Sequence, residues 1–250
     1  MNDHPATPPA LPGPYEPAEM NRKGGLFSAF GDQFRPAEGG LTFFQTIDAL
    51  LKRPGQIAHE IIHGDVLRVA PALIAVLLVC MAAYGALMAS FSGGAQFWVV
   101  PLKVCLGYLF SALICLPSLY IFVCLSGGRL SLGQVALLLL QSLALSALLL
   151  AGFAPIMWIF SQSTSAIAFM GFLHVLFWGV SACFALRLLG AAVTFVNRRP
   201  MGILTLWSAI FIAVVFQMAT FLRPLVGPFD GLDLHGKLFF LTHWMQTLGQ

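Results

Sequence analysis

The chain has 250 residues, of which 58% are hydrophobic and only 9% are charged. Soluble domains carry about 25% charged residues, so the composition excludes an ordinary soluble domain. None of the ten acidic residues lies between Val66 and Phe229, and ionisable groups are costly in hydrocarbon. The net charge of +3 is too small and too scattered for nucleic-acid binding. The composition therefore predicts a protein whose main partner is the lipid bilayer.

Residues 1–40 are rich in proline and glycine, which predicts a disordered arm. Such a segment cannot bury enough apolar surface to offset the entropy lost on ordering. Within it, four apolar residues are spaced as one helical face, namely Leu26, Phe27, Phe30 and Phe34. They indicate either a motif that binds a cytoplasmic protein partner or a linker that carries a few apolar side chains.

Residues 41–65 predict amphipathic helices at the membrane surface. Apolar residues from Phe43 to Leu51 follow the helical period. Thr42 and Gln45 can cap the start of the first helix, and Pro54 with Gly55 ends it. The segment 41–52 is too short to span a bilayer, so we expect it to lie in the plane of the headgroups.

Residues 66–229 predict a transmembrane domain of five spans, because each apolar segment holds the roughly 20 residues that a bilayer requires. The fold class is therefore an all-α, polytopic transmembrane helical bundle. Trp98, Trp158 and Trp207 lie near the ends of spans, as interfacial aromatic residues do. Residues 230–250 form a short, weakly amphipathic C-terminal tail. The predicted spans are 70–91, 97–125, 132–160, 167–196 and 203–222.

Basic residues alternate between the two sides of the predicted bundle. The first and third loops between spans carry no Lys or Arg, whereas the second carries Arg129 and the fourth Arg198 and Arg199. The positive-inside rule then places the N-terminus in the cytoplasm and the C-terminus outside. We expect the location to be a bacterial inner membrane. Six further basic residues precede the first span: Arg22, Lys23, Arg35, Lys52, Arg53 and Arg68.

His59, Glu60 and His63 form H-E-x-x-H, the signature of zinc metalloproteases. On a helix this spacing places both imidazoles on one face, with the glutamate as general base. A catalytic zinc requires a third protein ligand, and the next carboxylate after Asp65 is Asp230, predicted on the other side of the membrane. The pattern therefore favours a juxtamembrane amphipathic helix, with a metalloprotease as the alternative. We assign no catalytic, cofactor-binding or metal site.

Lys103 and Arg187 are the charges deepest within the predicted spans. They can bind an anion or a lipid headgroup, or they can extend to the nearer membrane surface. A channel or carrier for a neutral or anionic solute, lined by Lys103, is thus a second alternative function. His174 and Gln217 predict hydrogen bonds between helices. Small residues at four-residue steps favour close helix packing, and a homo-oligomer is among the expected assemblies: Ala82, Ala86 and Ser90, with Gly85 and Ala89.

The segment LLKRPGQIAHEIIHGD, residues 50–65, resembles the start of bacterial Yip-domain proteins, in which a basic residue and a proline precede an amphipathic helix and the spans. The resemblance covers about residues 42–223 and includes a proline-bearing cytoplasmic N-terminus, five spans and a short tail. The Asp-Leu-Tyr-Gly-Pro motif of eukaryotic members is absent. The resemblance implies membrane organisation or scaffolding, and no enzymatic activity.

Overall fold

The computed structural model describes residues 42–64, 66–92, 96–163, 167–197 and 202–221. Every element in these segments is a helix, as the sequence predicts. The predicted arm (1–40) and tail (230–250) lie outside the described residues. The helices are α2 (Phe43–Lys52), α3 (Pro54–His63), α4 (Val66–Ser92), α5 (Gln96–Leu125), α6 (Leu132–Ser163), α7 (Ile167–Asn197) and α8 (Gly202–Phe221).

Four of these helices, α4 to α7, are long and apolar enough to cross a membrane. The fifth, α8, is a shorter apolar helix that runs beside α5. The ends of all five agree with the predicted spans to within a few residues. The chain is therefore a helical membrane protein, and its fold class is confirmed.

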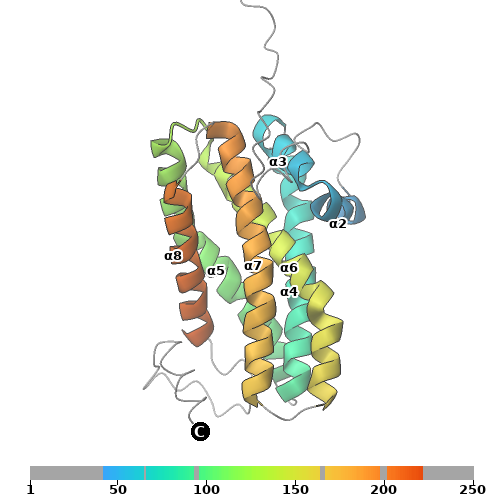
Figure 1. Ribbon diagram of the computed structural model, residues 1–250. Coiled ribbons are helices and arrows are strands. Elements are labelled where there is room, and N and C mark those ends of the chain that lie inside the picture. The colour runs from blue at the N-terminus through green and yellow to red at the C-terminus, as the bar shows by residue number, and fades with distance from the viewer. Residues whose placement is uncertain (1–41, 65, 93–95, 164–166, 198–201, 222–250) are drawn as a thin grey trace, which may run out of the picture.

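The five long helices alternate in direction (Figure 1). The first of them, α4, packs on both α5 and α6, while α7 packs on α6 and α8 packs on α5. Helix α3, the α5–α6 connection, the last turn of α7 and the first turn of α8 lie at the same end (Figure 1). We call this the α3 end. The α5–α6 connection thus lies at the same end as the helix ends that flank the predicted fourth loop.

The α5–α6 hairpin shows why both helices end where they do. Gly127 has a φ of 88°, and the N–H groups of Gly127 and Gly128 donate to the carbonyls of Cys124 and Val123, each at 3.0 Å. This is the arrangement by which glycine closes a helix C-terminus. Ser131 then begins α6, because its Oγ accepts from the N–H of Gln134 while its own N–H donates to Gln134 Oε1.

Helices α4 and α5 approach each other most closely at Gly85. A Cβ added there would lie 2.5 Å from the Cα of Pro101, so only glycine fits. Ala89 is also fully buried, whereas Ala82 and Ser90 are exposed. The predicted small residues therefore lie on two different faces of α4. The face that contains Gly85 packs on α5 and brings the first two spans together.

Trp207 corrects one expectation about the interfacial aromatic residues. It is fully buried between α8 and α5, where its Nε1–H donates to Ser118 Oγ at 3.1 Å and to the carbonyl of Cys115 at 3.3 Å. Trp158, in contrast, is exposed as expected. The indole at 207 holds two helices together because its polar atom finds partners on α5 and its ring fills apolar space.

Candidate functional site at the α3 end

Helix α2 lies across the outside of α4 and α6 near the α3 end (Figure 1). The predicted cap is confirmed, since the N–H of Thr42 donates to Gln45 Oε1 at 3.0 Å. Leu50 faces the bundle and is buried, whereas Phe44 is 80% exposed and Leu51 is 55% exposed. An apolar face on the outside of a helix bundle suits the boundary between headgroups and acyl chains. That α2 lies in the headgroup plane remains a prediction.

Helix α3 packs among α4, α6 and α7, and its buried face consists mainly of Ile57, Ala58 and Ile61, all fully buried. The helix begins at Pro54, whose fixed φ and missing N–H suit a first turn. It ends before Gly64, whose N–H donates to the carbonyl of Glu60 at 2.8 Å. The apolar face of this short helix is thus covered by protein.

Two glutamine side chains of α6 hold the two ends of α3. Gln134 Nε2 donates to the carbonyl of Ile62 at 2.9 Å, and Gln141 Nε2 donates to the carbonyl of Pro54 at 2.7 Å. The two glutamines lie seven residues apart, which is roughly 10 Å and two turns along one face of α6. Because the later glutamine binds the earlier residue of α3, the two helices run antiparallel. We call this pair of bonds the glutamine clamp.

Gln141 lies on α6 and binds α3, a helix that precedes the spans. Gln141 is 1% exposed, so its amide requires a partner inside the bundle. Gln134 serves two helices at once, because its Oε1 completes the cap of α6 and its Nε2 reaches α3.

Replacing Gln141 by leucine is expected to loosen α3 without preventing membrane insertion. One buried hydrogen bond contributes about 1 kcal/mol, which corresponds to roughly a fivefold increase in the locally opened population. Trypsin can cleave after Lys52 only when the end of α2 opens, so the cleavage rate should rise by about that factor. Gln162→Leu, at the exposed end of α6, serves as the control. Equal cleavage rates in wild type and Gln141→Leu would show that the clamp carries no stability.

The H-E-x-x-H residues lie on α3 as the spacing predicts. The imidazoles of His59 and His63 stack, with ring centroids 4.5 Å apart and planes 30° apart. His63 Nδ1 lies 3.3 Å from the carbonyl oxygen of His59. His59 is partly buried, and its Nδ1 is enclosed without a hydrogen-bond partner among the described residues. The structure thus brings both imidazoles to one face of the helix.

Burial lowers the pKa of His59 below its usual range, and the neighbouring His63 lowers it further, while Glu60 partly offsets the shift. Near pH 7 the His59 ring is therefore neutral, the form that binds metals. Within the described segments, no group of three or more His, Cys, Asp or Glu residues is placed to hold a metal ion. Asp230 lies outside these segments.

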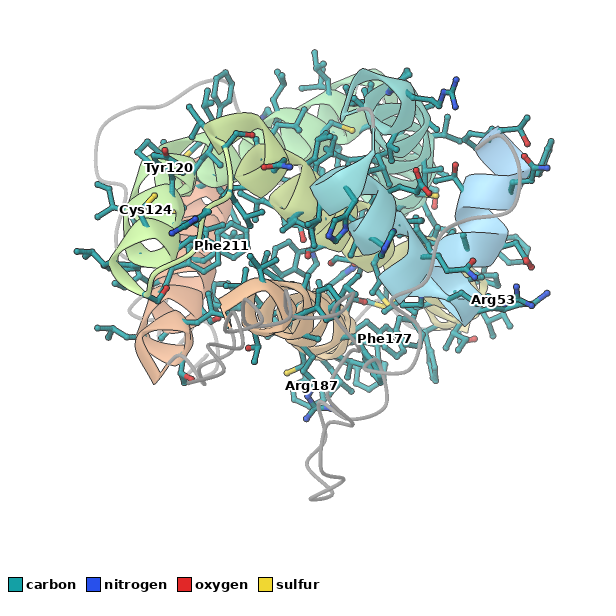
Figure 2. The ribbon with its side chains drawn as sticks, turned by 90° about the horizontal axis from the view of Figure 1, so that it is seen from above. Arg53, Tyr120, Cys124, Phe177, Arg187 and Phe211 are labelled. Atoms are coloured by element: carbon teal, nitrogen blue, oxygen red, sulfur yellow. The ribbon has the colours of Figure 1, made fainter. Side chains whose placement is uncertain are left out.

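The two charges deepest within the predicted spans lie in different parts of the bundle. Lys103 lies in α5 toward the end opposite α3, whereas Arg187 lies in α7, nearer the α3 end. Figure 2 shows Arg187 directed away from the bundle, as is Arg53 at the junction of α2 and α3. Arg129 is exposed in the α5–α6 hairpin. Lys103 and Arg187 therefore do not converge on one site.

His174 forms the predicted bond between helices. A hydrogen bond of 2.8 Å joins its Nδ1 to the hydroxyl of Tyr84 on α4, and both side chains are buried. Gln217 lies on an exposed position of α8. Tyr84 has no special sequence signal, so the pairing could not be predicted. For the glutamine clamp, in contrast, the sequence carries a signal. Ser131 and Gln134 have the spacing of a helix cap, and Gln134 and Gln141 have the spacing of one helix face.

No protein-family profile matches the chain, and no curated protein or solved structure matches it either.

Proposed function

We propose that the chain is a non-enzymatic integral membrane protein of the Yip-like type, which organises membrane or recruits partners as a scaffold. The observation that carries this proposal is the combination of a fixed α3 and an exposed α2. The glutamine clamp fixes α3, and α2 presents Phe44 and Leu51 beside the exposed ion pair of Lys52 and Asp48. A fixed platform with an apolar and charged surface suits docking rather than chemistry.

The charges support a cytoplasmic location for the α3 end. Of the six Lys and Arg residues that the structure describes, only Lys103 lies toward the opposite end. The positive-inside rule then orients this end toward the cytoplasm of a bacterial inner membrane, with the C-terminus outside. The arm (1–40) would enter the cytoplasm next to α2, where it can recruit a protein partner.

Deleting residues 1–40 tests the proposal in the otherwise complete chain. Reporter fusions after Gly94, Gly128, Ser163 and Pro200 should read outside, inside, outside and inside, both with and without the arm. Co-purification of cross-linked cytoplasmic partners should be lost with the arm. The matched control is a scrambled arm of identical composition, in which Leu26, Phe27, Phe30 and Phe34 no longer share a helical face. An unchanged set of partners after deletion, or another alternation of the reporters, would contradict the proposal.

The stacked pair of His59 and His63 favours a metalloprotease as the second candidate function. Its test is metal analysis of the purified chain. Stoichiometric zinc that is lost on His59→Ala would support the protease and contradict the scaffold, whereas a metal-free chain would exclude it. Solute flux in liposomes that disappears on Lys103→Ala would support a carrier instead.

A further inference from the structure

An apolar groove lies between α5 and α6, within the segments that can span the membrane. Its volume is about 140 Å³, and its floor consists of Ala112, Leu139 and Leu143, which are all buried. Leu113 forms an exposed rim with 62% of its surface accessible. The groove exists because Ala112 and Ala136, one on each helix, are shorter than the leucines around them.

The chemistry of the groove decides what fills it. Water requires two to four polar partners, and the lining is almost entirely apolar. Cavities of similar size that are lined by leucine stay dry and accept apolar molecules. A helix of a second chain is about 10–12 Å across with its side chains, which is too wide to enter a groove of about 140 Å³. A linear hydrocarbon chain fits and restores the dispersion contacts that an empty groove forfeits.

Arg129 supplies the polar end of such a site. It is exposed in the hairpin that joins the same two helices. On α6 the lining residue Ala136 follows the start of the helix at Leu132 by four residues, which is about 6 Å along a helix. On α5 the lining residue Leu116 precedes the end of the helix at Leu125 by nine residues, which is about 13 Å. A phospholipid whose phosphate lies beside Arg129 would therefore have an acyl chain long enough to reach the groove. Guanidinium groups bind phosphate well.

We infer that α5 and α6 form a binding site for one anionic phospholipid, with an acyl chain in the groove and the phosphate at Arg129. This inference is independent of the proposed scaffold function, because it concerns the spans and not the arm or α2.

The test is native mass spectrometry of the full chain, released from micelles that contain equal amounts of phosphatidylglycerol and phosphatidylcholine. Wild type should retain one phosphatidylglycerol. Ala112→Leu fills the floor and should lower lipid retention several-fold, as should Ala136→Leu from the opposite wall. Arg129→Ala should lower the preference for phosphatidylglycerol about fivefold, the contribution of one basic residue at an anionic surface. Ala83→Leu, at an exposed position of α4, is the control.

Each outcome decides the inference. Unchanged retention in both alanine variants would overturn it, and so would equal retention of the two lipids by wild type. A dimer that Ala112→Leu dissociates would show that a second chain occupies the groove. If Ala112→Leu fails to fold, Ala136→Leu and the exposed Arg129→Ala still test the two halves of the site.

Discussion

Replacing Gly85 by leucine is expected to separate α4 from α5 and to destabilise the bundle. Even a methyl group at this position would lie 2.5 Å from the Cα of Pro101. Backbone atoms cannot rotate away as a flexible side chain can, so the two helices must move apart. Overpacking typically costs about 1–3 kcal/mol, and we expect Gly85→Ala within this range and Gly85→Leu above it.

Unfolding in mixed micelles with increasing dodecyl sulfate, followed by circular dichroism, measures the effect. Gly152→Ala and Gly179→Ala are matched controls, because both glycines lie within helices and a Cβ at either position meets no atom within 4 Å. These two variants should be neutral or slightly stabilising, since alanine favours a helix by up to about 1 kcal/mol relative to glycine. A Gly85→Ala variant as stable as the controls would show that α4 and α5 are free to shift.

Replacing Trp207 by alanine is expected to release α8 from the bundle. The side chain is fully buried, stacks on Phe211 with ring planes 11° apart, and donates to Ser118 and Cys115 on α5. Truncating a buried aromatic residue costs about 3–5 kcal/mol. This loss of stability mainly affects the attachment of α8, because α8 packs mainly on α5 and has little contact with α7.

Trp158→Ala is the control for this prediction, because that indole is 52% exposed and its loss should leave the unfolding midpoint almost unchanged. Trp207→Phe keeps the ring and removes the donor, so it should lose about 1 kcal/mol, the contribution of a hydrogen bond. Both variants are measured in the same dodecyl sulfate titration. Equal midpoints for the alanine variants at 158 and 207 would contradict the role of Trp207 as an anchor.

The sequence predicts where helices begin and end because local chemistry determines these points. These signals affect only residues that are close to them in the sequence. Examples are Pro54, the cap formed by Thr42 and Gln45, and the glycines of the hairpin. The long apolar segments likewise predict spans, because a bilayer imposes their length. The fold class is therefore confirmed, and the helix ends agree with the predicted bounds to within a few residues. Four of these helices are long and apolar enough to cross a membrane.

The buried face of each span could not be predicted in the same way. The spans are apolar on every side, so no periodic pattern distinguishes the lipid face from the protein face. Trp207 was expected at the membrane interface and instead lies between two helices. The partner of Gln141 is likewise distant in sequence, because it is a carbonyl on a helix 87 positions earlier in the chain. Such pairings depend on tertiary packing, which a single sequence does not display.

The glutamine clamp constrains the order of events during biosynthesis. Helix α3 leaves the ribosome first, but its partners Gln134 and Gln141 follow 72 and 87 positions later. At roughly 5–20 residues per second, α3 waits on the order of 10 s for them. During this interval Ile57, Ala58 and Ile61 have no α6 to cover them, and the membrane surface is the apolar environment within reach. Nascent chains halted before Ser131 should therefore carry an α2–α3 pair that is not docked on α6, whereas chains halted after α6 has inserted can close the clamp.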